Sequence, residues 1–274
     1  MGTQRRLGGY RLLDEIGRGT TSVVHLAMDS AGREVVLKRL RPEYAAEPAG
    51  RRALAMEMAV QSRVRSDYVA RLLDGQVDAD QPYLVMQYAP GSPLGDLVAE
   101  YGPFGGERLP RLARRLALAL AAVHDAGVLH RDLAPKNVIV LGDRPILIDF
   151  GIARERGAAQ TTARGVLAGT PAFLAPELIE GEPATAASDV FSWAATLAFA
   201  GTGRPPFGAG TVPAVCFRIL RGEHDLAGIG EPLASLLPLG LRRDPTRRPT
   251  ARWFAGALAE GNVGVTDREG ASVA

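Results

Sequence analysis

The first third of the chain consists of short runs of β-branched, aliphatic and aromatic residues separated by glycine-bearing or proline-bearing turns. These runs lie at residues 10–16, 23–28, 34–38 and 81–87, and runs of this length between turn residues are typical of strands. Residues 51–64 predict a helix between the third and fourth strands. The sequence therefore begins as a small sheet accompanied by one helix.

The rest of the chain has mainly helical spacing. One apolar stripe recurs every three or four residues, and it predicts a core helix that ends near Gly127. The members of this stripe are Leu109, Leu112, Leu116, Leu120 and Val123. A further helix opens at Asp189 and is apolar on most faces, so we expect it to be buried. A last helix finishes over residues 252–260.

A hairpin is predicted between these two regions. Apolar runs at 138–141 and 145–148 are joined by a polar turn at 142–144, which is a hairpin signal. Because a hairpin of this length brings its ends together, Asn137 and Asp149 can share one divalent cation. Asp132, on the loop before the hairpin, is then left as a carboxylate that faces a substrate hydroxyl.

Composition narrows the class of protein. With 46% hydrophobic and 23% charged residues the chain is globular, and a net charge of +2 is too small to argue for nucleic-acid or membrane binding. Cys216 is the only cysteine, which suits a reducing cytosol. No signal peptide is visible, and the stretch 190–200 is shorter than the about 20 apolar residues that span a bilayer. We expect a cytoplasmic chain without a membrane segment.

Lysine is used at only two positions. Arginine is abundant, whereas Lys38 and Lys136 are the only lysines. Lysine carries a compact ammonium in place of the planar guanidinium of arginine. A chain that otherwise uses arginine therefore keeps lysine where a compact charge is needed, and both lysines fall beside candidate chemistry.

The stretch around the hairpin carries a specific motif. It reads His130-Arg131-Asp132-Leu133-Ala134-Pro135-Lys136-Asn137, followed after the hairpin by Asp149-Phe150-Gly151. This resembles the catalytic loop and metal motif of the eukaryotic-type (Hanks-type) bacterial serine/threonine protein kinases, and the likeness covers about residues 8–260.

The resemblance implies the α+β, two-lobed protein kinase fold. Residues from about 8 to 87 would form an N-lobe with a small antiparallel sheet and one helix, and residues from about 91 to 260 a mainly helical C-lobe. Residues 261–274 have little to bury and are expected to form a flexible tail.

The resemblance also implies an ATP site under the glycine-bearing turn after the first strand, where glycines let the backbone approach phosphate oxygens. Lys38 would hold the α- and β-phosphates, with Glu57 as its ionic partner. Met86 would gate the space behind adenine, and backbone groups of Gln87 and Ala89 would hydrogen-bond the adenine edge. The implied ATP-binding residues are Ile16, Gly17, Arg18, Gly19, Thr20, Thr21, Ser22, Val23, Val24, Val36, Lys38, Met86, Gln87 and Ala89.

The same resemblance assigns the chemistry. Asp132 would orient the attacking hydroxyl and accept its proton, while Asn137 and Asp149 would bind Mg²⁺ (or Mn²⁺) through hard oxygen atoms. Lys136 lies four residues after the aspartate, and we hypothesise that it reaches the γ-phosphate from there. Supporting roles are implied for Glu57, Arg131, Thr170, Glu177, Asp189 and Arg248, and the phosphorylation candidates are Thr161 and Thr162.

The expected activity is ATP-dependent phosphorylation of Ser or Thr in protein substrates, with autophosphorylation of the loop at 152–168. A weakly active or inactive kinase-like scaffold stays open because several positions depart from the family pattern, namely Ser22, Val36, Gln61 and Ala134. A small-molecule phosphotransferase of the same fold is a second alternative, although residues 169–177 resemble a peptide platform. Lys136 keeps tyrosine specificity open, and a homodimer is one of the oligomeric states left open.

Overall fold

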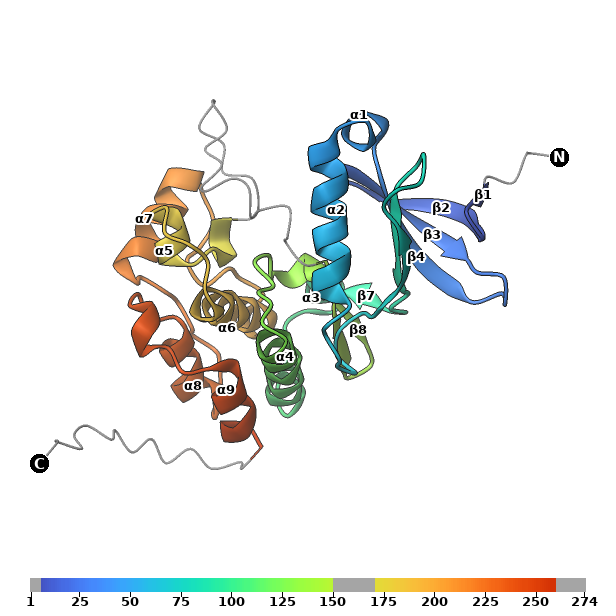
Figure 1. Cartoon of the computed structure of the whole chain (residues 1–274). Helices are drawn as coiled ribbons and strands as arrows, with labels where there is room; N and C mark the ends of the chain where they lie inside the picture. The colour runs from blue at the N-terminus through green and yellow to red at the C-terminus, as the bar shows by residue number, and fades with distance from the viewer. Residues whose placement is uncertain (1–5, 150–170, 260–274) are drawn as a thin grey trace, which may run out of the picture.

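The computed structural model describes residues 6–149 and 171–259. Its N-terminal part is a six-stranded antiparallel sheet in the order β1-β2-β3-β4-β6-β5 (Figure 1). The strands are β1 Arg6–Leu7, β2 Tyr10–Arg18, β3 Ser22–Met28, β4 Glu34–Leu40, β5 Leu72–Gln76 and β6 Tyr83–Gln87. A short helix, α1 Pro42–Ala45, leads into α2 Pro48–Gln61 beside the sheet.

Side-chain alternation in β4 decides what lies on each face of this sheet. Val35 and Leu37 are buried on one face, and the residues between and after them, including Lys38, point to the other. That second face carries Leu40 and Leu84, which pack against Leu54 of α2. Lys38 therefore projects on the side of the sheet that α2 covers.

The C-terminal part is mainly helical. Its helices are α3 Leu94–Tyr101, α4 Arg108–Asp125, α5 Pro176–Ile179, α6 Ala186–Thr202, α7 Val212–Arg221, α8 Leu233–Gly240 and α9 Ala251–Ala257. A small antiparallel sheet is formed by β7 Ser92–Pro93, β8 Val138–Leu141 and β9 Arg144–Leu147. Short 3-10 turns lie at Pro135–Asn137, Pro171–Phe173 and Pro245–Arg247.

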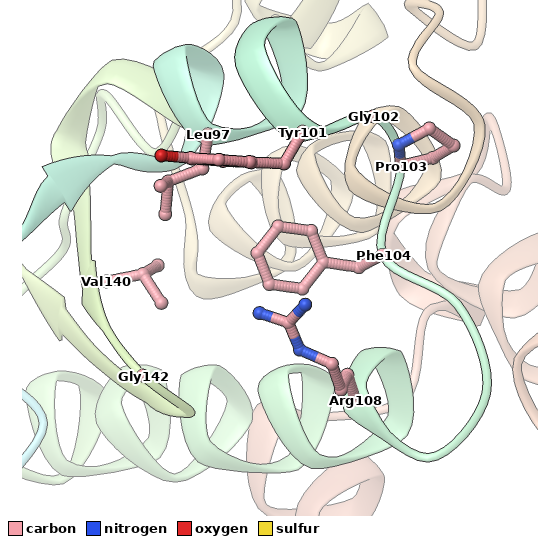
Figure 2. A pocket seen from close by; sticks show the side chains of 8 residues that line it. All are labelled: Leu97, Tyr101, Gly102, Pro103, Phe104, Arg108, Val140 and Gly142. Atoms are coloured by element: carbon pink, nitrogen blue, oxygen red, sulfur yellow. The ribbon is translucent and has the colours of Figure 1, made fainter.

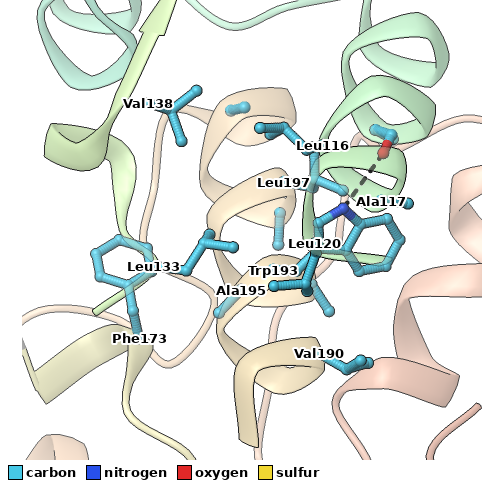
Figure 3. Close-up of a cluster of buried hydrophobic side chains, with 14 of the residues drawn as sticks. Leu116, Ala117, Leu120, Leu133, Val138, Phe173, Val190, Trp193, Ala195 and Leu197 are labelled. Atoms are coloured by element: carbon cyan, nitrogen blue, oxygen red, sulfur yellow. Dashed lines mark hydrogen bonds between the residues drawn. The ribbon is translucent and has the colours of Figure 1, made fainter. Parts of the chain in front are cut away.

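Helix α6 lies at the centre of this part and packs against α4 and α8. It is buried along most of its length, as its apolar sequence predicts. Figure 3 shows Trp193 of α6 reaching α4, where its indole N–H donates to the carbonyl of Ala113 at 3.2 Å. The apolar stripe of α4 packs into the same core and includes Leu116 and Leu120, both fully buried. The core thus forms a rigid base for the loops that join its helices.

The two parts meet beside the β8–β9 hairpin. The N–H of Leu147 donates to the carbonyl of Tyr68 at 2.8 Å, and the N–H of Ala70 donates to the carbonyl of Leu147 at 3.0 Å. The segment that joins β6 to β7 passes so close to β8 that a Cβ on Gly91 would lie 2.5 Å from the carbonyl oxygen of Val140. Gly91 also has φ = 138°, a conformation that glycine adopts readily.

Most predicted elements are present with shifted ends. The helix expected at 51–64 spans Pro48–Gln61, the helix expected to open at Asp189 begins at Ala186, and the last helix ends at Ala257. Strand β5 was not predicted, because its sequence Leu-Leu-Asp-Gly-Gln has no alternating pattern and stays largely exposed. In the two described ranges, no helix has both the length and the apolar character needed to cross a membrane.

Candidate active site

Lys38 and Glu57 form an ion pair between β4 and α2. Lys38 Nζ lies 2.6 Å from Glu57 Oε1, and the two side chains are 17% and 8% exposed. The implied contact is therefore present, and it joins residues from two separate elements. A mostly buried ammonium held by one carboxylate oxygen keeps a fixed direction.

Gln61 lies one turn after Glu57 and adds a second bond to the same carboxylate oxygen. Its Nε2 donates to Glu57 Oε1 at 3.2 Å, whereas its own Oε1 is buried without a hydrogen-bond partner among the described residues. A buried, unsatisfied carbonyl oxygen costs about 1–3 kcal/mol. The bond to Glu57 thus satisfies the amide nitrogen of Gln61 but not its oxygen. An apolar side chain at this position would need no hydrogen-bond partner.

The strand that leads into the glycine-bearing turn lies two strands from Lys38 in the sheet. Gly17 pairs with Val24, and Val24 pairs with Lys38 on the next strand. The turn is closed by a bond from the N–H of Gly19 to the carbonyl of Ser22 at 2.8 Å. The carbonyls of Thr20 and Thr21 accept hydrogen bonds from Arg41, at 3.1 Å and 2.9 Å respectively. Ser22 departs from the family pattern, which has a glycine at this position. Its carbonyl closes the turn, so a serine is compatible with it.

The residues expected around adenine lie on β4, on β6 and in the segment just after β6. Val36 pairs with Met86, and Ala89 is buried in a small apolar cluster with Ala70 and Ile146. The N–H of Gln87 donates to the carbonyl of Arg71 at 2.8 Å and belongs to the sheet hydrogen bonding. An adenine edge at this point would therefore need the N–H of Ala89 as its donor.

The loop before the hairpin is held by one carboxylate of α6. Asp189 accepts from the backbone N–H of His130 at 2.8 Å and from that of Arg131 at 2.7 Å, so the implied contact with this loop is present. His124 Nε2 also lies 3.0 Å from Asp189. Arg131 has φ = 65°, a left-handed conformation that costs about 1–3 kcal/mol and persists where surrounding bonds determine it.

His130 is fully buried and supports the loop from inside. Its Nε2 donates to the carbonyl of Ile148 at 3.0 Å, and its Nδ1 accepts from the N–H of Asp132 at 3.3 Å. Burial lowers the pKa of His130, against the opposing charge of Asp189. A neutral ring with this tautomer satisfies both contacts, which fits a packing and hydrogen-bonding residue.

The Asp132 carboxylate has two neighbours in its own loop. Lys136 Nζ lies 3.1 Å from Asp132 Oδ2, and Asn137 Nδ2 donates to the same oxygen at 3.1 Å and to the Asp132 carbonyl at 2.7 Å. The sequence expectation of a carboxylate left free is therefore wrong in this respect. The half-exposed Lys136 and the buried Asn137 hold Asp132 in one orientation.

The side-chain oxygens of Asn137 and Asp149 suit a hard divalent cation that is bound together with phosphate. The Ile148 N–H donates to the Asn137 carbonyl at 3.0 Å, so Asn137 and Asp149 are neighbours across the mouth of the hairpin. Because the Asn137 amide nitrogen points at Asp132, its Oδ1 is turned away from that residue, in a direction in which it can act as a ligand. Among residues 6–149 and 171–259, no group of three or more His, Cys, Asp or Glu could hold a metal alone. One amide and one carboxylate oxygen suit Mg²⁺, which usually takes its other ligands from phosphate and water.

A second, deeper ion pair lies under the site. Arg248 binds Glu177 through both terminal nitrogens, at 2.7 and 2.8 Å, and the Arg248 side chain is 0% exposed. Ser188 donates to the same carboxylate at 2.8 Å. Burial alone would raise the pKa of Glu177, but the hydrogen bonds from Arg248 and the backbone outweigh it and lower that pKa.

Comparison with known proteins decides the family. The protein kinase domain model matches residues 10–256, which is most of the chain. The chain belongs to the protein kinase domain family.

This kinase domain is similar to bacterial serine/threonine protein kinases. It is 36% identical to the probable serine/threonine-protein kinase PkwA of Thermomonospora curvata over 96% of this chain and 35% of that protein. It is 38% identical to the serine/threonine-protein kinase AfsK of Streptomyces coelicolor over 93% of this chain and 32% of that protein. The kinase domain thus spans about a third of the length of these curated relatives.

A solved structure supports the fold independently. The crystal structure of Rad53 1-466 in complex with AMP-PNP matches with a TM-score of 0.76 and covers 90% of this chain and 64% of that one. At 24% sequence identity this likeness shows the fold alone, and it confirms the predicted two-lobed kinase fold.

Three predicted residues of the kinase domain lie outside the described residues: Thr161, Thr162 and Thr170. The contacts of Gln61 with Glu57 and of His124 with Asp189 were not anticipated from sequence. In the sequence Gln61 is only a departure from the family pattern, which names no partner for it. His124 lies on the core helix, where its spacing gave no signal of a partner.

Proposed function

We propose that this kinase domain transfers the γ-phosphate of ATP to Ser or Thr hydroxyls of protein substrates. The observation that carries the proposal is the closed Lys38–Glu57 ion pair at 2.6 Å. An ammonium fixed on the face of the sheet that α2 covers, two strands from the strand that leads into the glycine-bearing turn, is arranged to hold phosphate oxygens. The serine/threonine kinases among its relatives support the choice of reaction.

The roles of the chain's own residues follow from their positions. Lys38 binds phosphate oxygens while Glu57 holds its ammonium and Gln61 keeps the Glu57 carboxylate in place. Asp132, whose direction is set by Lys136 and Asn137, orients the substrate hydroxyl and accepts its proton. Lys136 is half-exposed, so it can leave Asp132 and reach the γ-phosphate when a nucleotide binds. In phosphoryl transfer, such positioning and charge stabilisation supply most of the rate.

Asn137 and Asp149 are the residues that would hold Mg²⁺ (or Mn²⁺). When bound, the cation neutralises charge on the transferring phosphate oxygens. The left-handed backbone at Asp149, with φ = 55°, turns its side chain at the end of β9.

A phosphate-transfer assay separates this proposal from the scaffold alternative. The full chain would be incubated with radiolabelled ATP, Mg²⁺ and a Ser/Thr-containing protein substrate, with Asp132→Asn as the matched inactive control. General-base removal should lower the rate by about 10²–10⁴-fold. Equal incorporation by both proteins would contradict the role of Asp132, and no incorporation by the parent would favour the scaffold.

Autophosphorylation, oligomeric state and compartment stay predictions. Mass spectrometry of the active chain should find phosphate on Thr161 or Thr162, and the absence of both modifications would count against the loop switch. Identifying the proteins that become phosphorylated in a host lysate would name the substrates. The cytoplasmic assignment rests on the single cysteine, Cys216, and a homodimer would have to be tested by measuring mass in solution.

A further inference from the structure

A small pocket lies on the helical part, apart from the residues assigned to phosphate transfer. It has a volume of about 210 Å³ and lies between α3, the loop that enters α4, and the β8–β9 hairpin (Figure 2). Its lining residues are Leu97, Tyr101, Gly102, Pro103, Phe104, Arg108, Val140 and Gly142. None of them belongs to the predicted site.

The walls of this pocket are apolar and its rim is not. Figure 2 shows Leu97, Phe104 and Val140 around one open space, with Arg108 below the ring of Phe104. The Arg108 guanidinium lies 4.6 Å from the centre of that ring, a cation–π contact that orients it. Tyr101 is 73% exposed at the rim. A space of this size accepts a single aliphatic or aromatic side chain from a partner.

Positive charge gathers beside the pocket on α4. Arg108 and Arg111 share the carboxylate of Asp143 through long contacts of 3.5 and 3.7 Å, and both arginines are more than half exposed. Arg115 binds the backbone carbonyl of Asp143 and not its carboxylate. Three guanidinium groups thus meet around Asp143, two at its carboxylate and one at its backbone carbonyl.

We infer that this pocket and its arginines dock an acidic segment of a protein substrate. One apolar side chain of that segment enters the pocket, and carboxylates that flank it bind Arg108 and Arg111 in place of Asp143. The inference rests on the proposed function, because the occupant is a substrate of the kinase domain. Carboxylates match guanidinium groups whose present partner lies at 3.5 Å or more.

A nucleic acid fits this surface less well. The net charge of the chain is only +2, whereas binding to nucleic acid depends on many phosphate contacts. Only one lining ring, that of Tyr101, is largely exposed, whereas single-stranded nucleic acid binds along a positive groove with aromatic side chains for successive bases. An acidic peptide is therefore the occupant that both the charge and the pocket favour.

The first test is binding without nucleotide. A fluorescein-labelled ten-residue Gly/Ser peptide with one Leu followed by three Glu would be titrated with the full chain, and fluorescence anisotropy recorded. It should bind about tenfold more tightly than matched peptides with Lys for Glu or Gly for Leu. Raising the salt concentration from about 0.05 M to 0.5 M should weaken binding several-fold, because exposed charges are screened.

Variants locate the binding. Arg111→Glu should weaken the acidic peptide about tenfold and strengthen the Lys peptide, since charge reversal reverses the preference. Tyr101→Ala should weaken the acidic peptide two- to fivefold. Arg52→Ala, which removes an exposed helical arginine from α2, is the matched control and should change nothing. Far-UV circular dichroism would check that each variant is folded.

Three results would overturn the docking site: equal binding of acidic and basic peptides, Arg111→Glu binding like the parent, or a single-stranded oligonucleotide displacing the peptide at lower concentration than free peptide does. A kinetic arm separates this from the proposed function. Fusing the acidic segment to a Ser/Thr substrate peptide should lower KM about tenfold and leave kcat unchanged. Peptide binding by an inactive chain would reject only the proposed function, and activity without charge-dependent binding would reject only the docking site.

Discussion

Two ion pairs in this kinase domain each join a glutamate to a basic side chain, but they lie in different surroundings. The pair of Arg248 and Glu177 is bidentate, with the arginine side chain 0% exposed, and the guanidinium also binds the carbonyls of Arg242, Arg243 and Ala187. The pair of Lys38 and Glu57 has one short contact between β4 and α2, and the Lys38 side chain is 17% exposed.

The difference shows how one fold can contain an ion pair that stabilises the structure and another that is suited to binding a ligand. Every donor of Arg248 has a partner inside the helical part, so the pair can break only if that part opens. Lys38 has one described partner and an ammonium with three donors, so it can bind phosphate oxygens while it keeps its contact with Glu57 and without disturbing the core. The more exposed pair therefore suits ligand binding, and the buried pair suits stability.

The largest expected effect follows from breaking the buried pair. Arg248→Leu should lower the free energy of unfolding by about 3–5 kcal/mol, because it leaves the buried Glu177 carboxylate without its partner. Urea or thermal unfolding of the full chain measures this. Arg247→Leu changes an exposed neighbour and should alter stability by less than about 0.5 kcal/mol. A similar decrease in the free energy of unfolding in both variants would show that the buried pair of Arg248 and Glu177 has no special role in stability.

Loss of the pair between β4 and α2 should affect rate more than stability. Glu57→Gln removes the ionic partner of Lys38 and should reduce phosphate transfer by about 10²-fold, since a misplaced binding group costs that much. Its unfolding midpoint should stay near that of the parent. Glu43→Gln, which removes the exposed partner of Arg41 at 2.6 Å, serves as the control. A large stability loss in Glu57→Gln would mean that this pair is structural too.

Lys136 should give a smaller effect on the rate. Lys136→Ala should lower the transfer rate about tenfold and leave the affinity for ATP unchanged, because a half-exposed ammonium is screened by solvent. Lys136→Arg keeps the charge and should recover part of the rate. Steady-state kinetics at varied ATP concentration separates the two parameters. An unchanged rate in Lys136→Ala would remove it from the site.

The smallest effect concerns pH. Burial lowers the pKa values of His130 and His224 in the folded chain, so the unfolded chain takes up these protons first. The free energy of unfolding should therefore fall as the pH drops below about 6.5, the ordinary pKa of histidine. His224→Gln should reduce this slope in denaturation experiments between pH 7.5 and about 5.5. A slope that is the same in the variant would exclude His224 as a contributor.

Much of the fold could be predicted because its signals are local. The stripe of Leu112, Leu116 and their neighbours repeats with the period of a helix, and α4 forms there. The hairpin that joins Asn137 to Asp149 has apolar runs and a polar turn in adjacent positions. Strand β5 was not predicted because Asp74 and Gly75 interrupt its hydrophobic pattern. Its strand conformation depends on pairing with β6, which is a tertiary contact.

The sequence by itself determined the order of the elements, the faces they bury and the presence of each motif, since these depend on neighbouring residues and their spacing. Only the tertiary structure decided which groups touch. It placed Gln61 and Lys38 on one oxygen of Glu57, and it turned Lys136 onto Asp132. Such contacts depend on side-chain directions and on the packing of separate elements to within an ångström, which no local pattern specifies.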